Sequence, residues 1–394
     1  MSIASAIQNA QIKVANAYTA VSNKGGTLPA TQDLSNLPTA INSISGGTSF
    51  IGLQRMVGSN GVYQPPTSSH SFNFSVPSDA TKIGARSMQY AFFNCGGVTS
   101  VDLSSIVTID GQYALNCAFQ NCPNLTSVDL SSIVTVSASY AMGSTFQGCT
   151  SLVDIDLSNL TTVNGTHAMD STFTGCPNLT NVDLSSLTTI NGNNAMHYTF
   201  ATCTRLASVD LSNLTTISGT DAFSGAFGNC TSLTSMDLSG LTTINGNNAM
   251  SSTFSGCSNL ESVSFTNLQT IGENSSSTSY GHFSSCFNAC SKLTTITFPN
   301  LEKIYCTGGS TNSYGTFYGN NYIKKMYFPK LDTITYGTGA SATNQNACKK
   351  VFYSCNQLTE LHFAAANQSA IEASPGYSTA WGRGAGNVTI YFDL

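Results

Sequence analysis

An aspartate recurs every 27 residues over much of this chain, and its carboxylates are the first candidates for chemistry. Each stands between two apolar residues, as in Val-Asp-Leu, and the six are Asp102, Asp129, Asp156, Asp183, Asp210 and Asp237. Because neighbouring residues of a strand point to opposite faces, these carboxylates are expected to point outward, one above another at roughly 4.8 Å spacing. Past Asp237 the same position holds Ser264, Thr297, Tyr327 and His362.

This row of carboxylates, the acidic ladder, has two interpretations. It could bind cations or the hydroxyls of a glycan, and repulsion between neighbours is expected to raise some of the pKa values. Alternatively the ladder is structural, and each carboxylate accepts hydrogen bonds from a serine two residues further on, such as Ser131 or Ser158, and from adjacent repeats. Six identical residues make a uniform surface, whereas specific recognition needs variety, so the sequence favours the structural interpretation.

Aromatic and basic residues concentrate towards the C-terminus. Ten of the 16 tyrosines and eight of the 14 lysines and arginines lie after residue 279. Tyrosine combines a rigid flat face with a hydroxyl, which suits both sugar rings and protein epitopes. The candidate ligand-binding residues are Tyr280, His282, Tyr305, Tyr314, Tyr318, Tyr322, Tyr336 and Trp381. The same aromatic residues could instead pack irregular loops and cap the core.

Patterns typical of catalysis or metal binding are missing from the sequence. The five histidines are far apart, without the spacing of a triad or a metal site, and there is no Cys-x-x-Cys or Cys/His cluster. His167 and His197 replace other polar residues of the repeat and are expected to be exposed filler. We therefore predict no catalytic residue, no metal and no cofactor.

The elements that position these residues form a 27-residue repeat. Cysteines mark it at Cys95, Cys122, Cys149, Cys176, Cys203, Cys230 and Cys257, with a phenylalanine three residues before each. A unit this short cannot bury its own apolar face, so stacked coils must bury it as a solenoid. The periodic cysteines are expected to form a ladder of small, buried, reduced side chains, whereas Cys306 and Cys348 lie outside it and could pair.

The period breaks after Cys257. The next cysteine of the pattern is Cys290, the following coil has Asn320 where cysteine belongs, and the last coil ends at Cys355. The extra residues fall near 273–283, 305–315 and 336–347, at one position of successive coils. Insertions at one position project from one face, often the binding face. The sequence then ends in a stretch, 387–394, that is typical of a closing strand.

The pattern LxxVDLSxLTTIxxxxAMxxTFxGC resembles the leucine-rich repeat superfamily, most closely its BspA-like branch, over residues 72–363. The resemblance implies a mainly β fold, a leucine-rich-repeat solenoid of about ten 27-residue coils. It would have longer, irregular coils at the C-terminal end and a short N-terminal α-helical segment. Known BspA-like proteins are mostly adhesins and surface-binding proteins, and no catalytic motif belongs to the family.

The leader is expected to be helical. Residues 2–24 carry apolar residues on one helical stripe, which could cover the open end of the solenoid or pair with copies of itself as a homo-oligomer. The segment NKGGTLPATQDLSNLPTAINSI resembles N-terminal segments of phage tail and fibre proteins from gut bacteria. That resemblance implies attachment to a larger virion or surface assembly through residues 1–47. The N-terminus has no recognisable secretory signal, and no apolar stretch is long enough for a membrane span.

These observations lead to a domain division and a function. We predict a helical leader at 1–47, an N-terminal cap and first coil at 48–95, the solenoid at 96–363 and a C-terminal cap at 364–394.

Only 8% of the residues are charged, the net charge is −5 and no basic run occurs, which argues against a nucleic-acid partner.

The leading hypothesis is a non-enzymatic receptor-binding protein. It would be a phage tail-fibre component, located on the virion, that recognises a bacterial surface glycan or protein through its irregular C-terminal coils. The alternative is a bacterial BspA-like adhesin at the cell surface or outside the cell. A polysaccharide-degrading solenoid enzyme is a third hypothesis, of a different class.

Overall fold

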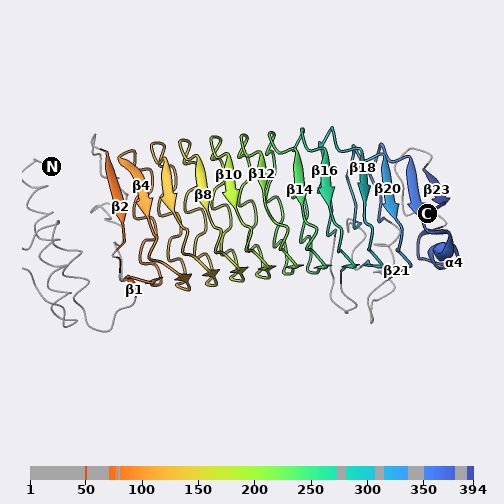
Figure 1. The fold of residues 1–394 in the computed structure, drawn as a ribbon, viewed down its shortest axis with the longest axis horizontal. Coiled ribbons are helices and arrows are strands. Elements are labelled where there is room, and N and C mark those ends of the chain that lie inside the picture. Colours follow the sequence, from red (N-terminus) through yellow and green to blue (C-terminus); the bar gives the residue numbers. More distant parts are fainter. Residues whose placement is uncertain are drawn as a thin grey trace, which may run out of the picture.

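The computed structural model describes residues 49–50, 71–76, 78, 80–272, 281–306, 315–335, 350–377 and 388–394. Within them the chain winds into an elongated solenoid whose short strands lie in rows along its length (Figure 1). The predicted mainly β solenoid of about ten coils is confirmed. The predicted leader helix lies outside the described residues. Among those residues no helix is both long and apolar enough to cross a membrane.

One row of strands forms a continuous parallel sheet of 11 strands, the Thr-Ile sheet. Its residue pairs follow the repeat, as in Thr162↔Thr189 and Val163↔Ile190. In order the strands are β1 (Ser49–Phe50), β3 (Lys82–Ile83), β5 (Thr108–Ile109), β7 (Thr135–Val136), β9 (Thr162–Val163), β11 (Thr189–Ile190), β13 (Thr216–Ile217), β15 (Thr243–Ile244), β17 (Thr270–Ile271), β19 (Lys303–Tyr305) and β21 (Thr333–Thr335).

A second row of parallel strands, the aspartate sheet, carries the acidic ladder. Its strands are β2 (Phe72–Ser75), β4 (Val98–Asp102), β6 (Ser127–Asp129), β8 (Asp154–Asp156), β10 (Asn181–Asp183), β12 (Ser208–Val209), β14 (Ser235–Asp237), β16 (Ser262–Ser264), β18 (Thr295–Thr297), β20 (Lys325–Phe328), β22 (Glu360–Phe363) and β23 (Thr389–Phe392). Pairing runs from β2 to β12, and an isolated bridge between Asp210 and Asp237 continues it to β14 and β16. It resumes as a separate sheet from β18 to β23.

The third side of each regular coil is a run of turns, not a helix or a strand. Residues in the left-handed region recur along it, such as Tyr113 (φ 57°) and Cys117 (φ 55°). The backbone between them bonds to the next coil, as when the N–H of Leu115 donates to the carbonyl of Ala141 at 2.8 Å. Regular hydrogen bonding between coils on this side offsets the cost of the unusual backbone conformation.

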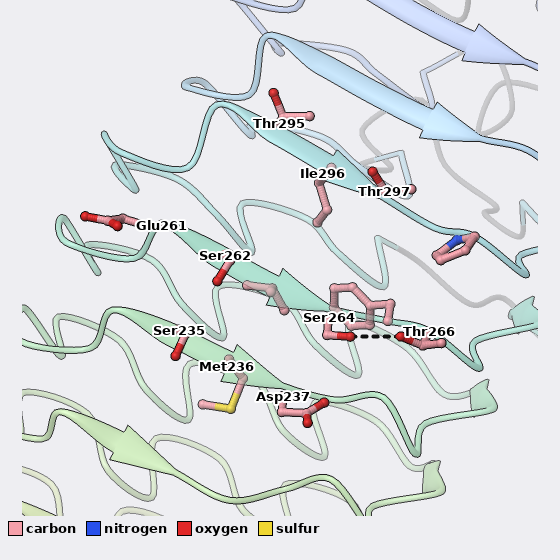
Figure 2. A pocket seen from close by; sticks show the side chains of 13 residues that line it. Ser235, Met236, Asp237, Glu261, Ser262, Ser264, Thr266, Thr295, Ile296 and Thr297 are labelled. Atoms are coloured by element: carbon pink, nitrogen blue, oxygen red, sulfur yellow. Dashed lines mark hydrogen bonds between the residues drawn. The ribbon is translucent and has the colours of Figure 1, made fainter. Parts of the chain in front are cut away.

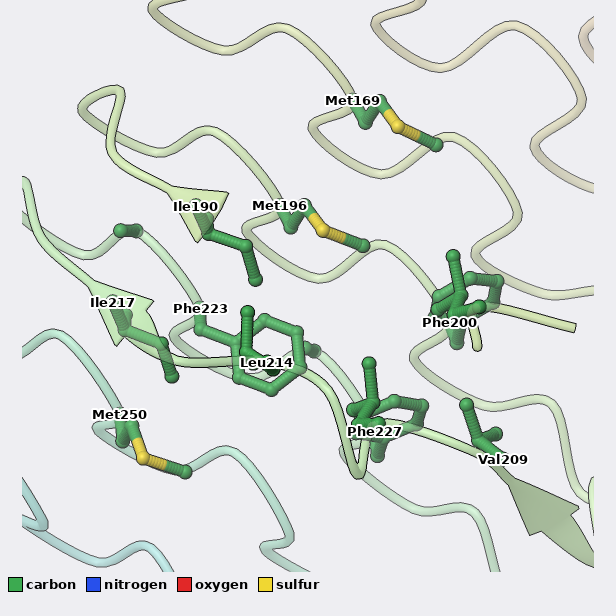
Figure 3. Close-up of a cluster of buried hydrophobic side chains, with 14 of the residues drawn as sticks. Met169, Ile190, Met196, Phe200, Val209, Leu214, Ile217, Phe223, Phe227 and Met250 are labelled. Carbon is green, nitrogen blue, oxygen red and sulfur yellow. The ribbon is translucent and has the colours of Figure 1, made fainter. Parts of the chain in front are cut away.

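Identical apolar side chains stack in columns inside the solenoid. The phenylalanine before each cysteine is buried, and the rings of Phe146, Phe173 and Phe200 lie parallel with centroids 5.4–5.5 Å apart. Figure 3 shows part of this core, where Phe227 stacks on Phe200 of the preceding coil at 5.5 Å and meets Phe223 edge to face at 5.6 Å. Each coil therefore buries its apolar face against its neighbours, as the repeat predicts.

The ladder of buried cysteines is confirmed. Each thiol donates to the carbonyl of the phenylalanine 30 residues earlier in the regular coils, for example Cys176 Sγ to Phe146 O at 3.2 Å. None of the ladder cysteines forms a disulfide. Asn320, which stands where cysteine belongs, is also buried and donates to the carbonyl of Phe283 at 3.1 Å. Cys348 lies outside the described residues, so a pair with Cys306 stays a prediction.

The described C-terminal end comprises a short 3-10 helix, Ala365–Asn367, the helix α4 (Gln368–Glu372) and the last strand. Ile371 of α4 is buried. The strand β23 pairs in parallel with β22, so the predicted closing strand is confirmed.

Candidate functional site

The acidic ladder lies on the outer face of the aspartate sheet. All six carboxylate residues are exposed, whereas the neighbours of Asp102, which are Val101 and Leu103, are 2% and 0% exposed. Paired strands bring Asp102 opposite Asp129 in register. The predicted outward orientation is therefore confirmed, and it follows from strand alternation alone.

Each ladder carboxylate accepts a hydrogen bond from the backbone N–H two residues on. The N···O distances are 2.8–3.0 Å at all six positions. The hydroxyls of Ser131 and Ser212 also donate, at 2.7 Å, to Asp129 and Asp210. The ladder thus closes the turn that follows each strand, which supports the structural interpretation.

The expected rise in carboxylate pKa is wrong for two members of the ladder. Hydrogen bonds from the hydroxyl and the backbone N–H of Ser104 lower the pKa of Asp102 below its ordinary value. The backbone N–H and the hydroxyl of Ser212 lower that of Asp210. These donors favour the ionised form more than neighbouring carboxylates disfavour it, because the side chains are well solvated and their repulsion is screened.

We expect Asp210→Ala to lower the free energy of unfolding at pH 7 by roughly 0.5–1 kcal/mol, because the N–H of Ser212 loses its acceptor. Asp210→Asn keeps an acceptor and should lose less. Since the pKa of Asp210 is lowered in the folded state, its stabilising effect is present above about pH 4 and disappears as the pH falls. Urea unfolding at pH 7 and pH 3 measures both effects. A large drop in melting temperature on adding chelator would instead indicate bound cations.

At the C-terminal end the ladder position changes from carboxylates to aromatic rings. Tyr327, His362 and Tyr391 pair in register and stack with ring centroids 4.4 and 4.6 Å apart. Both ring nitrogens of His362 face carboxylates, Nδ1 at 2.9 Å from Asp393 and Nε2 at 3.1 Å from Glu360. The imidazole is thus held between two tyrosines and two carboxylates.

A surface ion pair flanks this stack. The ammonium of Lys325 lies 2.8 Å from Glu360, holding the pKa of Glu360 below its usual value, and His362 adds to that effect. Glu360 in turn raises the pKa of Lys325. Sequence reasoning placed Tyr327 and His362 on the ladder but missed Tyr391. Alignment of the closing stretch TIYF with ELHF at 360–363 would have found it.

The predicted ligand-binding tyrosines are distributed over different parts of their coils. Tyr305 ends β19 of the Thr-Ile sheet and is half-buried. Tyr318 and Tyr322, also half-buried, lie in the turns before β20, and the ring of Tyr318 stacks on that of Tyr353 at 5.9 Å. The other predicted residues Tyr280, Tyr314, Tyr336 and Trp381 lie outside the described residues, so their role stays a prediction.

His282 is a correction to the predicted set. Its surface is only 2% exposed, so its ring does not lie on a binding surface. The carbonyl of His282 accepts from the N–H of Met250, as that of Ala195 accepts from Met169. His282 therefore occupies the position where regular coils carry a buried alanine. Counting back eight residues from Cys290, the distance between Ala195 and Cys203 in a regular coil, would have shown this.

Another stack of aromatic side chains lies on the side of the solenoid that is formed by turns. Rings of Tyr113, Tyr140 and His167 stack with centroids 5.0 and 4.5 Å apart, and the guanidinium of Arg86 lies 4.6 Å over Tyr113. The 27-residue spacing of the three rings was the signal that sequence reasoning left unused.

Asp170 connects His167 of this column to His197 of the following coil. Its two carboxylate oxygens lie 2.7 Å from Nδ1 of His167 and 3.4 Å from Nδ1 of His197. Burial acts to raise the pKa of Asp170, but hydrogen bonds from His197, His167 and Ser171 outweigh it and lower the pKa. The expectation that both histidines are exposed filler is therefore wrong, since their side chains are about three-quarters buried.

Two hollows lie along the aspartate sheet. One, of about 370 Å³, lies over β4, β6 and β8. The other, of about 480 Å³, lies over β14, β16 and β18, and Figure 2 shows its lining side chains spread along these three strands. In the described part of the chain, no group of three or more His, Cys, Asp or Glu residues is placed to hold a metal ion.

A family model described as a BspA type leucine-rich repeat region matches this chain. The matches overlap and extend from residue 67 to residue 338, which is more than half of the sequence. The matched ranges are 67–196, 118–244, 169–302 and 224–338. A comparison with curated proteins finds no match.

Solved structures with similar folds include leucine-rich repeat proteins of two bacteria. A leucine-rich repeat protein from Bacteroides ovatus ATCC 8483 is 22% identical, with a TM-score of 0.44, over 74% of this chain and 63% of that one. The T. pallidum leucine-rich repeat protein is 19% identical, with a TM-score of 0.31, over 57% of this chain and 78% of that one. The chain thus spans less than two thirds of the Bacteroides protein's length.

Proposed function

Because this chain belongs to the BspA-type leucine-rich repeat family, we propose that it is a non-enzymatic receptor-binding protein. In this proposal it is a phage tail-fibre component that recognises a bacterial surface glycan or protein through its irregular C-terminal coils. Membership of the family supports a role in binding. Which ligand is bound depends on the residues that the solenoid displays.

The proposal depends on a change of residue type along the outer face of the aspartate sheet. The outward-facing position of the aspartate sheet is occupied by a carboxylate in six successive coils, and then by Ser264, Thr297, Tyr327, His362 and Tyr391. This change coincides with the loss of the 27-residue period. The C-terminal coils therefore display a varied surface of hydroxyls and tyrosine rings, groups that recognition surfaces favour, whereas His362 between the two tyrosines is only 7% exposed.

The proposal also includes attachment of the protein to a virion. Residues 1–47 resemble phage tail and fibre leaders and would join the solenoid to a larger assembly. A second candidate function, a BspA-like adhesin on the bacterial surface, is favoured by the family match itself, which extends from residue 67 to residue 338. Genes next to the coding sequence distinguish the two, as tail and baseplate genes would support the first and surface-anchoring genes the second.

Recognition is expected to depend on the C-terminal tyrosines. Replacing Tyr305, Tyr314 and Tyr336 together by alanine should reduce binding of the fluorescent full-length protein to a panel of gut bacteria by at least 100-fold. Aromatic anchors lose about 2 kcal/mol or more each on truncation, which corresponds to roughly 30-fold per residue. Flow cytometry measures the binding, and circular dichroism verifies that the variant is folded.

The matched control is Tyr198→Ala, which removes an exposed tyrosine from a regular coil. It should bind as the unchanged protein does. Equal binding by the triple variant would move the site elsewhere, and binding to none of the bacteria would contradict the proposed function.

A further inference from the structure

Strand pairing differs between the two sheets where the coil of β16 and β17 meets the coil of β18 and β19. The Thr-Ile sheet is continuous there, with Thr270 paired to Lys303 and Ile271 to Ile304. The aspartate sheet is interrupted, since β16 pairs with β14 and β18 pairs with β20 but β16 and β18 are not paired. The coils therefore remain together on one side and separate on the other. This is the first coil with extra residues, 33 from Cys257 to Cys290 instead of 27.

The separation produces the larger hollow, which we call the β16–β18 groove. Its volume is about 480 Å³, within the range of roughly 300–1,000 Å³ that is typical of small-molecule sites. Val263 contributes to the floor and is partly exposed, whereas Met236 and Ile296 of the strands on either side are 3% exposed. The groove thus has an apolar floor that regular coils keep covered.

Polar groups surround this floor. Hydroxyls come from six residues, which are Ser235, Ser262, Ser264, Thr266, Thr295 and Thr297. Because β16 and β18 do not pair with each other, the backbone N–H and C=O groups on their facing edges are also available to a ligand. A hydroxyl-rich wall over a small apolar floor matches a sugar, which carries hydroxyls on its edge and C–H groups on its faces.

We propose that the β16–β18 groove binds a neutral oligosaccharide. This inference rests on the proposed binding function and names the ligand class for one surface of it. Asp237 and Glu261 are the ionisable side chains of the lining, and Lys292 balances Glu261 at 3.1 Å. The remaining negative charge favours neutral sugars over sialic or uronic acids, since a carboxylate on the ligand would be repelled.

A peptide fits the groove less well. Peptides that bind to open sheet edges do so as an added strand, and their affinity comes from a row of backbone hydrogen bonds. The strands β16 and β18 are only three residues long each, so they offer few such bonds. A ligand with hydroxyls in several directions uses the surrounding serines and threonines better.

The smaller hollow provides an internal control. It has the same kinds of lining residues, including Ser100, Asp102, Ser127 and Asp129, and lies on the same sheet. Its strands are paired, however, with Ser127 opposite Ser100 and Asp154 opposite Ser127. Its backbone groups are therefore already bonded, and its valine floor is buried. The two hollows share their surface chemistry and differ in the opening of the sheet.

The test uses two matched substitutions of exposed serines. Ser262 faces the groove and pairs with Ser235, and Ser127 has the same place in the smaller hollow. Ser262→Ile removes a hydroxyl and fills the groove, whereas Ser127→Ile makes the same change over the closed sheet. Both should fold, because β-branched residues suit exposed strand positions. Ser262→Thr retains the hydroxyl.

The probes are immobilised neutral oligosaccharides of glucose, galactose, mannose or N-acetylglucosamine, with sialylated and uronic-acid oligosaccharides beside them. We expect the full chain to bind at least one neutral oligosaccharide. Ser262→Ile should weaken that binding at least tenfold, whereas Ser127→Ile and Ser262→Thr should change it less than threefold. Absence of binding to every neutral oligosaccharide, stronger binding to acidic ones, or equal loss in both isoleucine variants would overturn the proposal.

The same variants separate this inference from the proposed function. If the full chain binds bacterial cells and Ser262→Ile binds them and the oligosaccharides equally well, the groove is not the sugar site but the receptor-binding function stands. If the chain binds no cell while it binds a neutral oligosaccharide through Ser262, the groove is correct and the proposed function is wrong.

Discussion

Above about pH 9 the solenoid is expected to lose stability steeply. Burial raises the pKa of Cys176, Cys257 and Cys355 from 9.0 to about 12, and it also raises the pKa of Cys203 and Cys230. The folded chain therefore retains protons that the unfolded chain releases. Stability from these thiols is complete below pH 9 and decreases as the pH rises towards 12.

The expected slope is large because the thiols act together. Each thiol that ionises only on unfolding lowers the free energy of unfolding by about 1.4 kcal/mol per pH unit. A domain has roughly 5–15 kcal/mol in all, so a ladder of several thiols should unfold it within about two pH units. Denaturant unfolding followed by circular dichroism at pH 8, 9, 10 and 11 measures the slope.

A variant isolates the thiol contribution from lysine and tyrosine titration. Cys176→Ala with Cys203→Ala removes two ladder thiols, and its free energy of unfolding should fall with pH about 2–3 kcal/mol per unit less steeply than that of the unchanged chain. Each protein is compared with itself at pH 8, which cancels the loss of packing. Parallel curves for the two proteins would show that the ladder thiols do not govern alkaline unfolding.

Phe173→Ala is expected to destabilise the solenoid by about 3–5 kcal/mol. The ring is completely buried and stacks on Phe146 and Phe200 at 5.5 and 5.4 Å, so its removal leaves a cavity between three coils. Each coil of a solenoid contacts only its neighbours, and hydrogen exchange should therefore increase most in the coils next to the substitution. Urea unfolding gives the free energy, and exchange mass spectrometry gives its location.

The control for this prediction is Val153→Ala, at an exposed position of the same coil. It should change the free energy of unfolding by less than about 0.5 kcal/mol. A loss below about 1 kcal/mol for Phe173→Ala would mean that the phenylalanine column does not hold the coils together.

The repeating part of this protein could be predicted from its sequence. The 27-residue period gave the coil, the outward acidic ladder and the buried cysteines, and Asn320 was recognised as a ladder position without a cysteine. These predictions succeeded because a coil packs against copies of itself. When neighbours are identical, an apolar position in one coil is an apolar position in the next, and spacing along the chain is equivalent to position in space.

The irregular part was decided by the tertiary structure. The contacts of His362 with Asp393 and Glu360, and the opening between β16 and β18, depend on how unequal coils align. An insertion lengthens one side of a coil, and packing on the other sides determines whether the sheet closes or separates. Once the period is lost, spacing in the sequence no longer defines the register between coils, so only the packed structure determines which side chains meet.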